Sequence, residues 1–77
     1  MNDFNQHIEI NPAVMLGKPV IKGTRITVEN IIGELGAGYT MEEVLKAHPR
    51  LTKETVMAAL QYATAILKNE RIFLAAS

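Results

Sequence analysis

The stretch that decides the fold is TMEEVLKAHPRLTKETVMAAL, which runs from Thr40 to Leu60. It contains two helical patterns separated by Pro49, because proline lacks the backbone donor that a helix interior needs. The first pattern opens with a capping box, in which the Thr40 hydroxyl and the Glu43 carboxylate each bond a backbone N–H group. The residues that then recur on one face are Met41, Val44, Leu45 and His48. We predict a helix over residues 41–48, with His48 capping or packing at its end.

The second pattern begins at Thr52, a favourable cap, with Glu54 in the first turn, where a carboxylate complements the helix dipole. We predict a helix over residues 53–68. Its predicted inward face consists of Val56, Ala59, Leu60, Ala63 and Leu67. Two helices joined by only Pro49-Arg50-Leu51, with Leu51 filling the corner, are typical of a helix-turn-helix unit.

A further helix is predicted before this unit, over residues 28–36. Thr27 is a suitable cap, and Gly36 and Gly38 are suitable helix-ending residues. The apolar residues between them follow the spacing i, i+3, i+4, i+7, at Val28, Ile31, Ile32 and Leu35.

The first 26 residues carry β signals instead. Ile8-Glu9-Ile10 alternates apolar and polar residues, and Asn11-Pro12 ends that pattern. Val20-Ile21 and Arg25-Ile26 are β-prone, with Lys22-Gly23 between them as a tight turn. Gly23 supplies the positive φ that such a turn requires, which places Lys18 and Lys22 outward and Val20 and Ile26 toward the helices.

The predicted fold is therefore mainly α, a trihelical, homeodomain-like helix-turn-helix with a short N-terminal β element. The 77 residues form a single domain. Within it, residues 8–26 form short strands or a hairpin, residues 27–69 form the three-helix unit, and residues 70–77 form a C-terminal tail. The sequence leaves open whether this tail extends the third helix, forms a strand or hangs free.

Composition excludes several classes of protein. There is no cysteine, hence no disulfide, thiolate zinc site or thiol nucleophile, and the only histidines are His7 and His48. Ser77 is the only serine, and adjacent Glu42 and Glu43 point about 100° apart on a helix, so neither supplies a catalytic set. We expect no enzymatic activity, no metal, no cofactor and no small-molecule substrate.

Charge and hydropathy bear on partners and location. Eight Lys+Arg against eight Asp+Glu give a net charge of zero, which counts against DNA binding by a single copy and favours self-association. A thin core at this length also favours a homodimer. Apolar runs fall short of the ~20 residues of a membrane span. The first residues, MNDFNQH, lack the features of a signal peptide, so we expect a cytoplasmic protein.

Two groups of residues are candidates for nucleic-acid binding. The stretch GKPVIKGTRI, residues 17–26, carries Lys18, Lys22 and Arg25 with no carboxylate. It is either an arm that contacts phosphates or a solvated hairpin in which Arg25 pairs with a carboxylate or a backbone carbonyl. It is not a phosphate loop, because the spacing of that motif is absent.

The second group lies at the start of the predicted third helix. Its outward residues are Lys53, Glu54, Met57 and Gln61. Gln61 can contact adenine and Lys53 can contact guanine or phosphate, whereas Glu54 repels phosphate. The alternative is a polar surface or a protein interface, which the adaptable side chain of Met57 favours.

The segment from Asn11 to Ala63 also resembles the domain-of-unknown-function 433 family. The elements that carry the resemblance are the GKPVIKGTRI stretch, Ala37-Gly38, the segment from Glu43 to Leu51, and Ala59 to Ala63. The resemblance covers roughly residues 8–65. It implies a homeodomain-like helix-turn-helix preceded by short strands, and it implies an antitoxin of a type II toxin–antitoxin pair whose partner is a PIN-like nuclease.

The expected function is accordingly an antitoxin-like regulator that restrains a nuclease toxin and binds its own operator DNA. The residues expected to cover the partner's acidic metal site are Lys68, Arg71, Ile72, Phe73 and Leu74. The alternative is a protein-interaction or dimerisation module with the same fold and no nucleic-acid binding, which the zero net charge and Glu54 favour.

Overall fold

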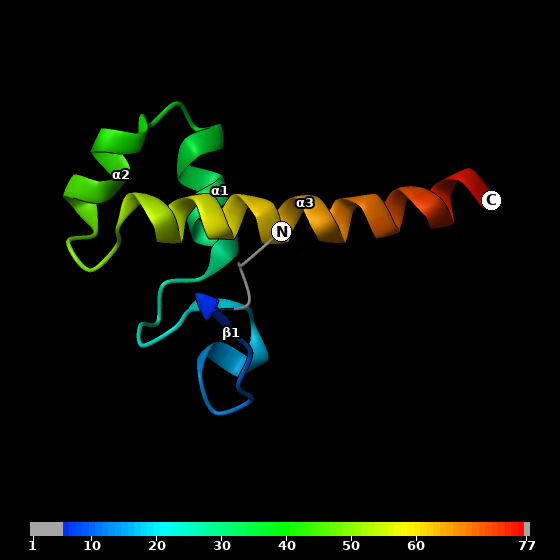
Figure 1. Cartoon of the computed structure of the whole chain (residues 1–77), viewed down its shortest axis with the longest axis horizontal. Coiled ribbons are helices and arrows are strands. Elements are labelled where there is room, and N and C mark those ends of the chain that lie inside the picture. Colours follow the sequence, from blue (N-terminus) through cyan, green and yellow to red (C-terminus); the bar gives the residue numbers. More distant parts are fainter. Residues whose placement is uncertain (1–5, 77) are drawn as a thin grey trace.

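The computed structural model of the chain describes the backbone of residues 6–76 and the side chains of residues 6–68. The elements follow in the order β1 (Ile8–Glu9), η2 (Met15–Gly17, a 3₁₀ turn), β2 (Val20–Ile21), α1 (Val28–Gly36), α2 (Met41–Ala47) and α3 (Lys53–Ala76). Three helices and a small sheet make a mainly α fold (Figure 1), which confirms the predicted class.

The predicted β element exists, but its two strands are joined by a long connection that contains η2 and not by a tight hairpin turn. β1 pairs antiparallel with β2, with Ile8 opposite Ile21 and Glu9 opposite Val20. The chain after β2 closes the predicted tight turn, in which the Ile21 N–H donates to the Ile26 carbonyl at 3.0 Å. Gly23 in this turn has φ of +81°, as predicted. Val20 is fully buried, and Ile26 packs against the core.

Each helix starts at the threonine that the sequence indicates. The Thr27 hydroxyl accepts from the Asn30 N–H at 3.0 Å, and the Thr52 hydroxyl accepts from the Thr55 N–H at 3.3 Å. At α2 both halves of the predicted capping box are present: Glu43 N–H donates to the Thr40 hydroxyl, and Thr40 N–H donates to the Glu43 carboxylate. These caps satisfy backbone donors that would otherwise lack partners.

The first helix ends in a Schellman motif. The Tyr39 N–H donates to the Glu34 carbonyl at 3.0 Å, and the Gly38 N–H donates to the Leu35 carbonyl at 3.1 Å. Gly38 has φ of +106°, a backbone conformation that glycine adopts at little cost. The chain therefore reverses sharply into α2, and α1 and α2 lie next to each other (Figure 1).

The core lies where α1, α2, α3 and β2 meet. Leu51 is buried at the corner between α2 and α3, as predicted. The buried cluster consists of Ile21, Val28, Ile31, Val44, Leu51, Val56 and Ala59.

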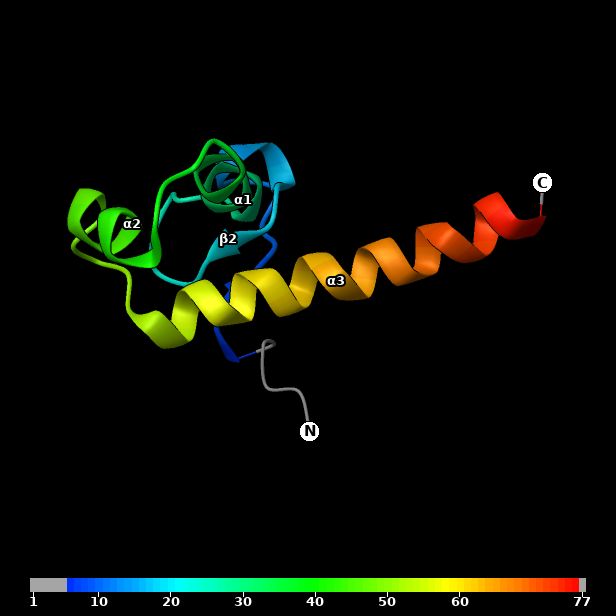
Figure 2. The same cartoon turned by 90° about the horizontal axis from the view of Figure 1, so that it is seen from above.

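The predicted inward face of α3 needs correction at two positions. Leu67 is 59% exposed rather than buried, and Ala58, which the helical pattern leaves out, is buried. β1 contacts α3, so the small sheet covers a side of this helix that the three-helix pattern leaves open. The residues near Leu67, in contrast, lie where α3 leaves the body of the domain (Figure 2).

The third helix is longer than predicted. It continues to Ala76 instead of ending at residue 68, so the predicted tail is helical over residues 70–76, and Ser77 lies outside the described residues. Its 24 residues correspond to a length of about 36 Å. Figures 1 and 2 both show its C-terminal part projecting from the body with no other element beside it.

An arginine does tie the β turn to the helices, but it is Arg50. The Arg50 guanidinium donates to the Gly23 carbonyl at 2.8 Å, from the loop between α2 and α3. Arg25, for which the sequence suggests this role, is exposed and makes no hydrogen bond or ion pair with the side chains and backbone of residues 6–68. Arg50 lies 27 residues from Gly23, a separation that no local pattern reveals.

Replacement of Gly23 by Ala tests the turn. The space around Gly23 is open, so a methyl group meets no atom and the cost comes from the backbone alone. A positive φ in a non-glycine residue costs about 1–2 kcal/mol, and we expect the free energy of unfolding in urea to fall by that amount. Gly33→Ala is the matched control, because its surroundings are equally open and it lies inside α1, where alanine stabilises by about 0.5–1 kcal/mol. Equal changes in the free energy of unfolding for Gly23→Ala and Gly33→Ala would contradict a positive φ at Gly23.

The Arg50 contact makes a second prediction. Arg50→Ala should lower the free energy of unfolding by about 1 kcal/mol, because it removes a charge-assisted hydrogen bond at the surface. The melting temperature then falls by roughly 4–8 °C in a domain of this size. Arg25→Ala, the control, should change stability by less than about 0.5 kcal/mol. A larger loss for Arg25→Ala than for Arg50→Ala would refute this assignment.

Candidate nucleic-acid and partner interface

The outward face of α3 gathers residues that the sequence assigns to two separate sites. Lys53, Met57 and Gln61 are exposed, and Lys68 is exposed on the same helix. Gln61 and Lys68 are seven residues apart, about two turns, and so lie on one face. An open hollow of about 250 Å³ runs along this face and is lined by Met57, Leu60, Gln61, Thr64, Ala65 and Lys68. The predicted nucleic-acid residue Gln61 and the predicted partner residue Lys68 therefore share one surface.

The polar side chains on this face are not engaged within the domain. Among residues 6–68, Lys53, Gln61 and Lys68 make no side-chain hydrogen bond or ion pair. Glu54 stands beside Lys53 in the first turn of α3 and is exposed as well. Met57, 45% exposed, adds apolar area to the face. The surface is thus polar with an apolar centre and a cation at each end.

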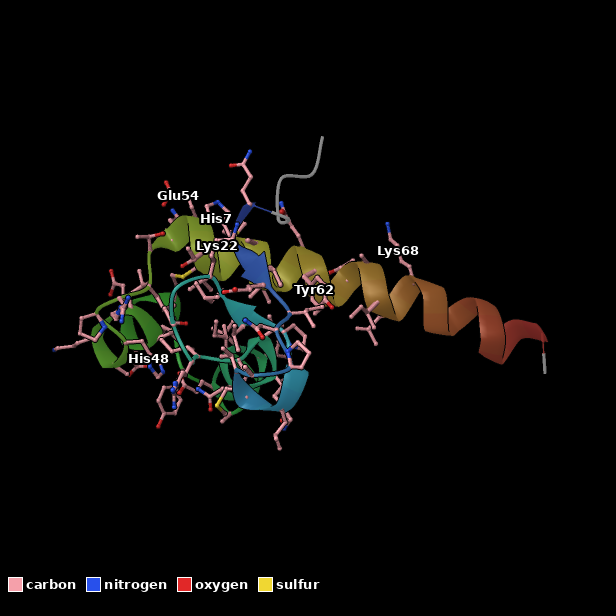
Figure 3. The ribbon with its side chains drawn as sticks, turned by 90° about the horizontal axis from the view of Figure 1, so that it is seen from below. His7, Lys22, His48, Glu54, Tyr62 and Lys68 are labelled. Atoms are coloured by element: carbon pink, nitrogen blue, oxygen red, sulfur yellow. The ribbon has the colours of Figure 1, made fainter. Side chains whose placement is uncertain are left out.

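The three cations of the GKPVIKGTRI stretch do not form one cluster. The Lys18 ammonium pairs with Glu29 of α1 at 3.3 Å, and both side chains are exposed. Lys22 is exposed, and its backbone N–H donates to the His7 carbonyl at 2.8 Å. Figure 3 shows Lys22 and His7 on the side of the molecule that also presents Glu54. In this view Lys22 is presented on the same side as the start of α3, whereas Lys18 is paired with α1.

A strained turn precedes Lys18. Met15 and Leu16 have φ of +49° and +58°, and the Lys18 N–H donates to the Met15 carbonyl at 3.1 Å. Positive φ at a residue with a side chain costs roughly 1–2 kcal/mol. Burial of Leu16 does not offset this cost, since its side chain is 93% exposed. The sequence gives no signal of this turn beyond Gly17, whose φ is +82°.

His48 joins the ends of α1 and α2. It is the C-cap of α2, the position predicted for it, and its Nε2 lies 2.9 and 3.1 Å from the two carboxylate oxygens of Glu34. Asn30 also donates to Glu34, at 3.2 Å. Both side chains of the His48–Glu34 pair are largely covered. The pair has a structural role in holding two helices together, and sequence reasoning missed Glu34 because it lies 14 residues away.

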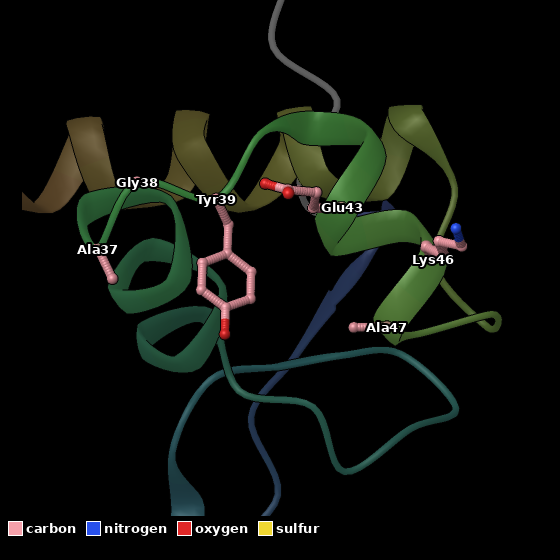
Figure 4. Close-up of a pocket in the computed structure, with 6 residues that line it drawn as sticks. All are labelled: Ala37, Gly38, Tyr39, Glu43, Lys46 and Ala47. Atoms are coloured by element: carbon pink, nitrogen blue, oxygen red, sulfur yellow. The ribbon is translucent and has the colours of Figure 1, made fainter.

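A second open hollow, of about 570 Å³, lies between the α1–α2 turn and α2 and is lined by Ala37, Gly38, Tyr39, Glu43, Lys46 and Ala47 (Figure 4). The Glu43 carboxylate is held at 2.8 Å by the Thr40 N–H as part of the capping box. Within the described part of the chain, no group of three His, Cys, Asp or Glu residues is placed to hold a metal ion. No helix in that part is long and apolar enough to cross a membrane.

The comparisons with known proteins agree with one another. The chain is 36% identical over 55 residues to the uncharacterised protein y4eO of Sinorhizobium fredii, an alignment that covers 71% of this chain and 25% of the relative. The chain thus spans about a quarter of the length of that curated relative. Its fold is similar to the crystal structure of a DUF433 member protein from Anabaena variabilis, with a TM-score of 0.77 and 30% identity over 90% of this chain and 68% of that one.

The family comparison covers most of the domain. The family described as "Protein of unknown function (DUF433)" matches residues 8–63, from β1 through the part of α3 that packs in the core. The resemblance suggested by the GKPVIKGTRI stretch is thereby confirmed. The chain belongs to the DUF433 family.

Proposed function

We propose that the protein is an antitoxin-like regulator of the cytoplasm. It restrains a PIN-like nuclease toxin and, as a homodimer, binds its own operator DNA through α2 and α3, with no catalytic step of its own. The observation that carries this proposal is the outward face of α3, where Lys53, Gln61 and Lys68 stand exposed with no partner among residues 6–68. In a helix-turn-helix, the N-terminal part of the second helix enters the major groove.

The residue types on this face suit that role. Gln61 can donate to and accept from the edge of adenine, and Lys53 can contact guanine or a phosphate. Lys22, on the side of the molecule that presents the start of α3, adds a phosphate contact, and Lys18 and Arg25 extend the cationic stretch along the backbone of the DNA. The exposed Lys18–Glu29 pair contributes only about 0.2–1 kcal/mol, so a phosphate competes for Lys18 at little cost.

The toxin-binding part of the proposal concerns the projecting end of α3. This end carries Lys68, Arg71, Ile72, Phe73 and Leu74, of which only the side chain of Lys68 belongs to the described residues. A continuous helix that leaves the body is a suitable element for insertion into the groove of another protein. A cation placed at the acidic site of a nuclease competes electrostatically with the catalytic metal ion.

A second candidate function is a protein-interaction or dimerisation module that binds no nucleic acid. The apolar side chain of Met57 at the centre of the α3 face supports it, since Met adapts to irregular apolar partners. Glu54 beside Lys53 and the zero net charge support it as well, because neither favours a polyanion. The two functions differ in one measurable property, which is affinity for DNA at low salt.

Removal of single cations tests the DNA interface. Lys22→Ala and Lys53→Ala should each weaken binding to the DNA upstream of the gene and to a scrambled duplex alike. Each should also reduce the slope of log affinity against log salt by about one, as expected for one lost phosphate contact. Fluorescence anisotropy from 50 to 300 mM salt measures both. Lys46→Ala is the control, because Lys46 is an exposed lysine that lines the hollow at the α1–α2 turn and is none of the residues proposed to contact DNA. If the parent protein binds neither duplex at 50 mM salt, the interaction module is the better account.

Gln61→Ala separates sequence recognition from phosphate contact. It should weaken binding to the operator by about 1–3 kcal/mol, because a bidentate base contact is lost, and leave the scrambled duplex and the salt slope unchanged. Thr64→Ala is a matched control one turn further along α3, since its hydroxyl already donates to the Leu60 carbonyl at 2.8 Å. Equal losses on both duplexes would mean that Gln61 contacts no base.

A further inference from the structure

An apolar groove lies between α1 and α3, close to the point where α3 leaves the body. It has a volume of about 450 Å³, and its apolar lining includes Val28 and Ile32 from α1 and Tyr62, Ala63, Ile66 and Leu67 from α3. Ile66 is 40% exposed and Leu67 is 59% exposed. The Glu29 carboxylate lies at its rim. This groove lies on the side of α3 that faces α1, away from Lys53 and Gln61, and no side chain of residues 6–68 fills it.

The apolar face of α3 continues past the groove. Positions 73 and 74 come seven residues, about two turns, after positions 66 and 67, and therefore fall on the same face of the helix backbone. The sequence has Phe73 and Leu74 there. A helical end of this length is marginal in water on its own, because helices in proteins gain most of their stability from packing of an apolar face. The groove and the projecting end thus both need a partner.

We propose that two copies of the chain associate, with the projecting end of α3 of each copy packing at the groove of the other. The projecting end of α3 of one copy lies antiparallel along α3 of the second and reaches the mouth of its groove at Ile66 and Leu67, and the arrangement is repeated by two-fold symmetry. This inference rests on the homodimer of the proposed function and not on its DNA. Because the toxin is proposed to bind the same end of α3, a bound toxin takes the place of the second copy at this end. A symmetric pairing of one surface with itself closes as a dimer.

The apolar positions indicate the register. When the two-fold axis passes between positions 70 and 71, position 67 of one copy lies opposite position 74 of the other, so leucine positions face each other on both sides of the axis. The overlap then runs from Ala65 to Ala76, a length of about 18 Å or three helical turns. A net charge of zero adds no repulsion between the copies.

The first test is the mass of the full chain by light scattering at about 50 µM. We expect the mass of two chains. Leu67→Glu should weaken dimerisation by roughly 100-fold or more and give the mass of one chain, since an unpaired carboxylate is costly at a buried contact. Its fold should persist, because Leu67 is exposed in the single chain. Met57→Glu is the control on the outward face of α3 and should remain dimeric. A monomeric parent, or a dimeric Leu67→Glu variant, overturns the proposal and assigns the groove to another occupant.

The second test concerns orientation and register. The chain has no cysteine, so Leu67→Cys and Leu74→Cys each introduce a single thiol. Under oxidation, an antiparallel pairing joins the two variants when they are mixed and joins neither variant to itself, and the reverse pattern overturns the orientation. Absence of the mixed disulfide between the Leu67→Cys and Leu74→Cys variants overturns the register. These tests use no DNA and no toxin, so a protein that fails them and still binds DNA at 50 mM salt refutes this pairing and not the DNA interface.

Discussion

Burial of one face of the N-terminal half of α3 is the interaction on which the rest of the structure depends. Val56 and Ala59 are fully buried, and they pack with Ile31 of α1, Val44 of α2 and Leu51 of the corner between the helices. A chain of 77 residues has little other apolar surface to bury, so loss of this contact removes most of the core. The contact also fixes which side of α3 is left for binding.

Because only half of α3 packs in the core, three parts of its surface differ in their surroundings. The inward face holds the domain together. The outward face presents Lys53, Gln61 and Lys68, and the projecting end continues the apolar groove next to Ile66. The core packing, the proposed nucleic-acid contact and the proposed pairing with a second copy use different parts of this helix.

Two polar contacts set how the remaining elements meet this helix. The His48–Glu34 pair holds the end of α2 against the end of α1, and the Arg50–Gly23 hydrogen bond holds the β turn against the loop before α3. The second contact positions the turn that carries Lys22. Each contact contributes little energy alone.

Helix caps and tight turns were predictable from the sequence, and contacts between residues distant in the sequence were not. Thr27, Thr40 and Thr52 begin their helices, and Gly23 adopts its positive φ, because each depends on neighbours within four residues. The Arg50 tie spans 27 residues, so the sequence pointed to Arg25 instead. The burial of Ala58 follows from contact of β1 with α3, which a helical pattern read on its own does not contain. The lysines of the GKPVIKGTRI stretch were recognised as exposed, but only the fold separates Lys18 from Lys22.

Amide hydrogen exchange tests the division of α3 into a half that packs in the core and a half that is proposed to associate with a second copy. Amides of residues 56–63 should be strongly protected at both concentrations, because they exchange only with global unfolding. Amides of residues 68–76 should exchange rapidly at 1 µM and become at least about 10-fold more protected at 200 µM, as mass action shifts the population to the dimer. Rapid exchange of residues 68–76 at both concentrations, or full protection at both, would contradict the account.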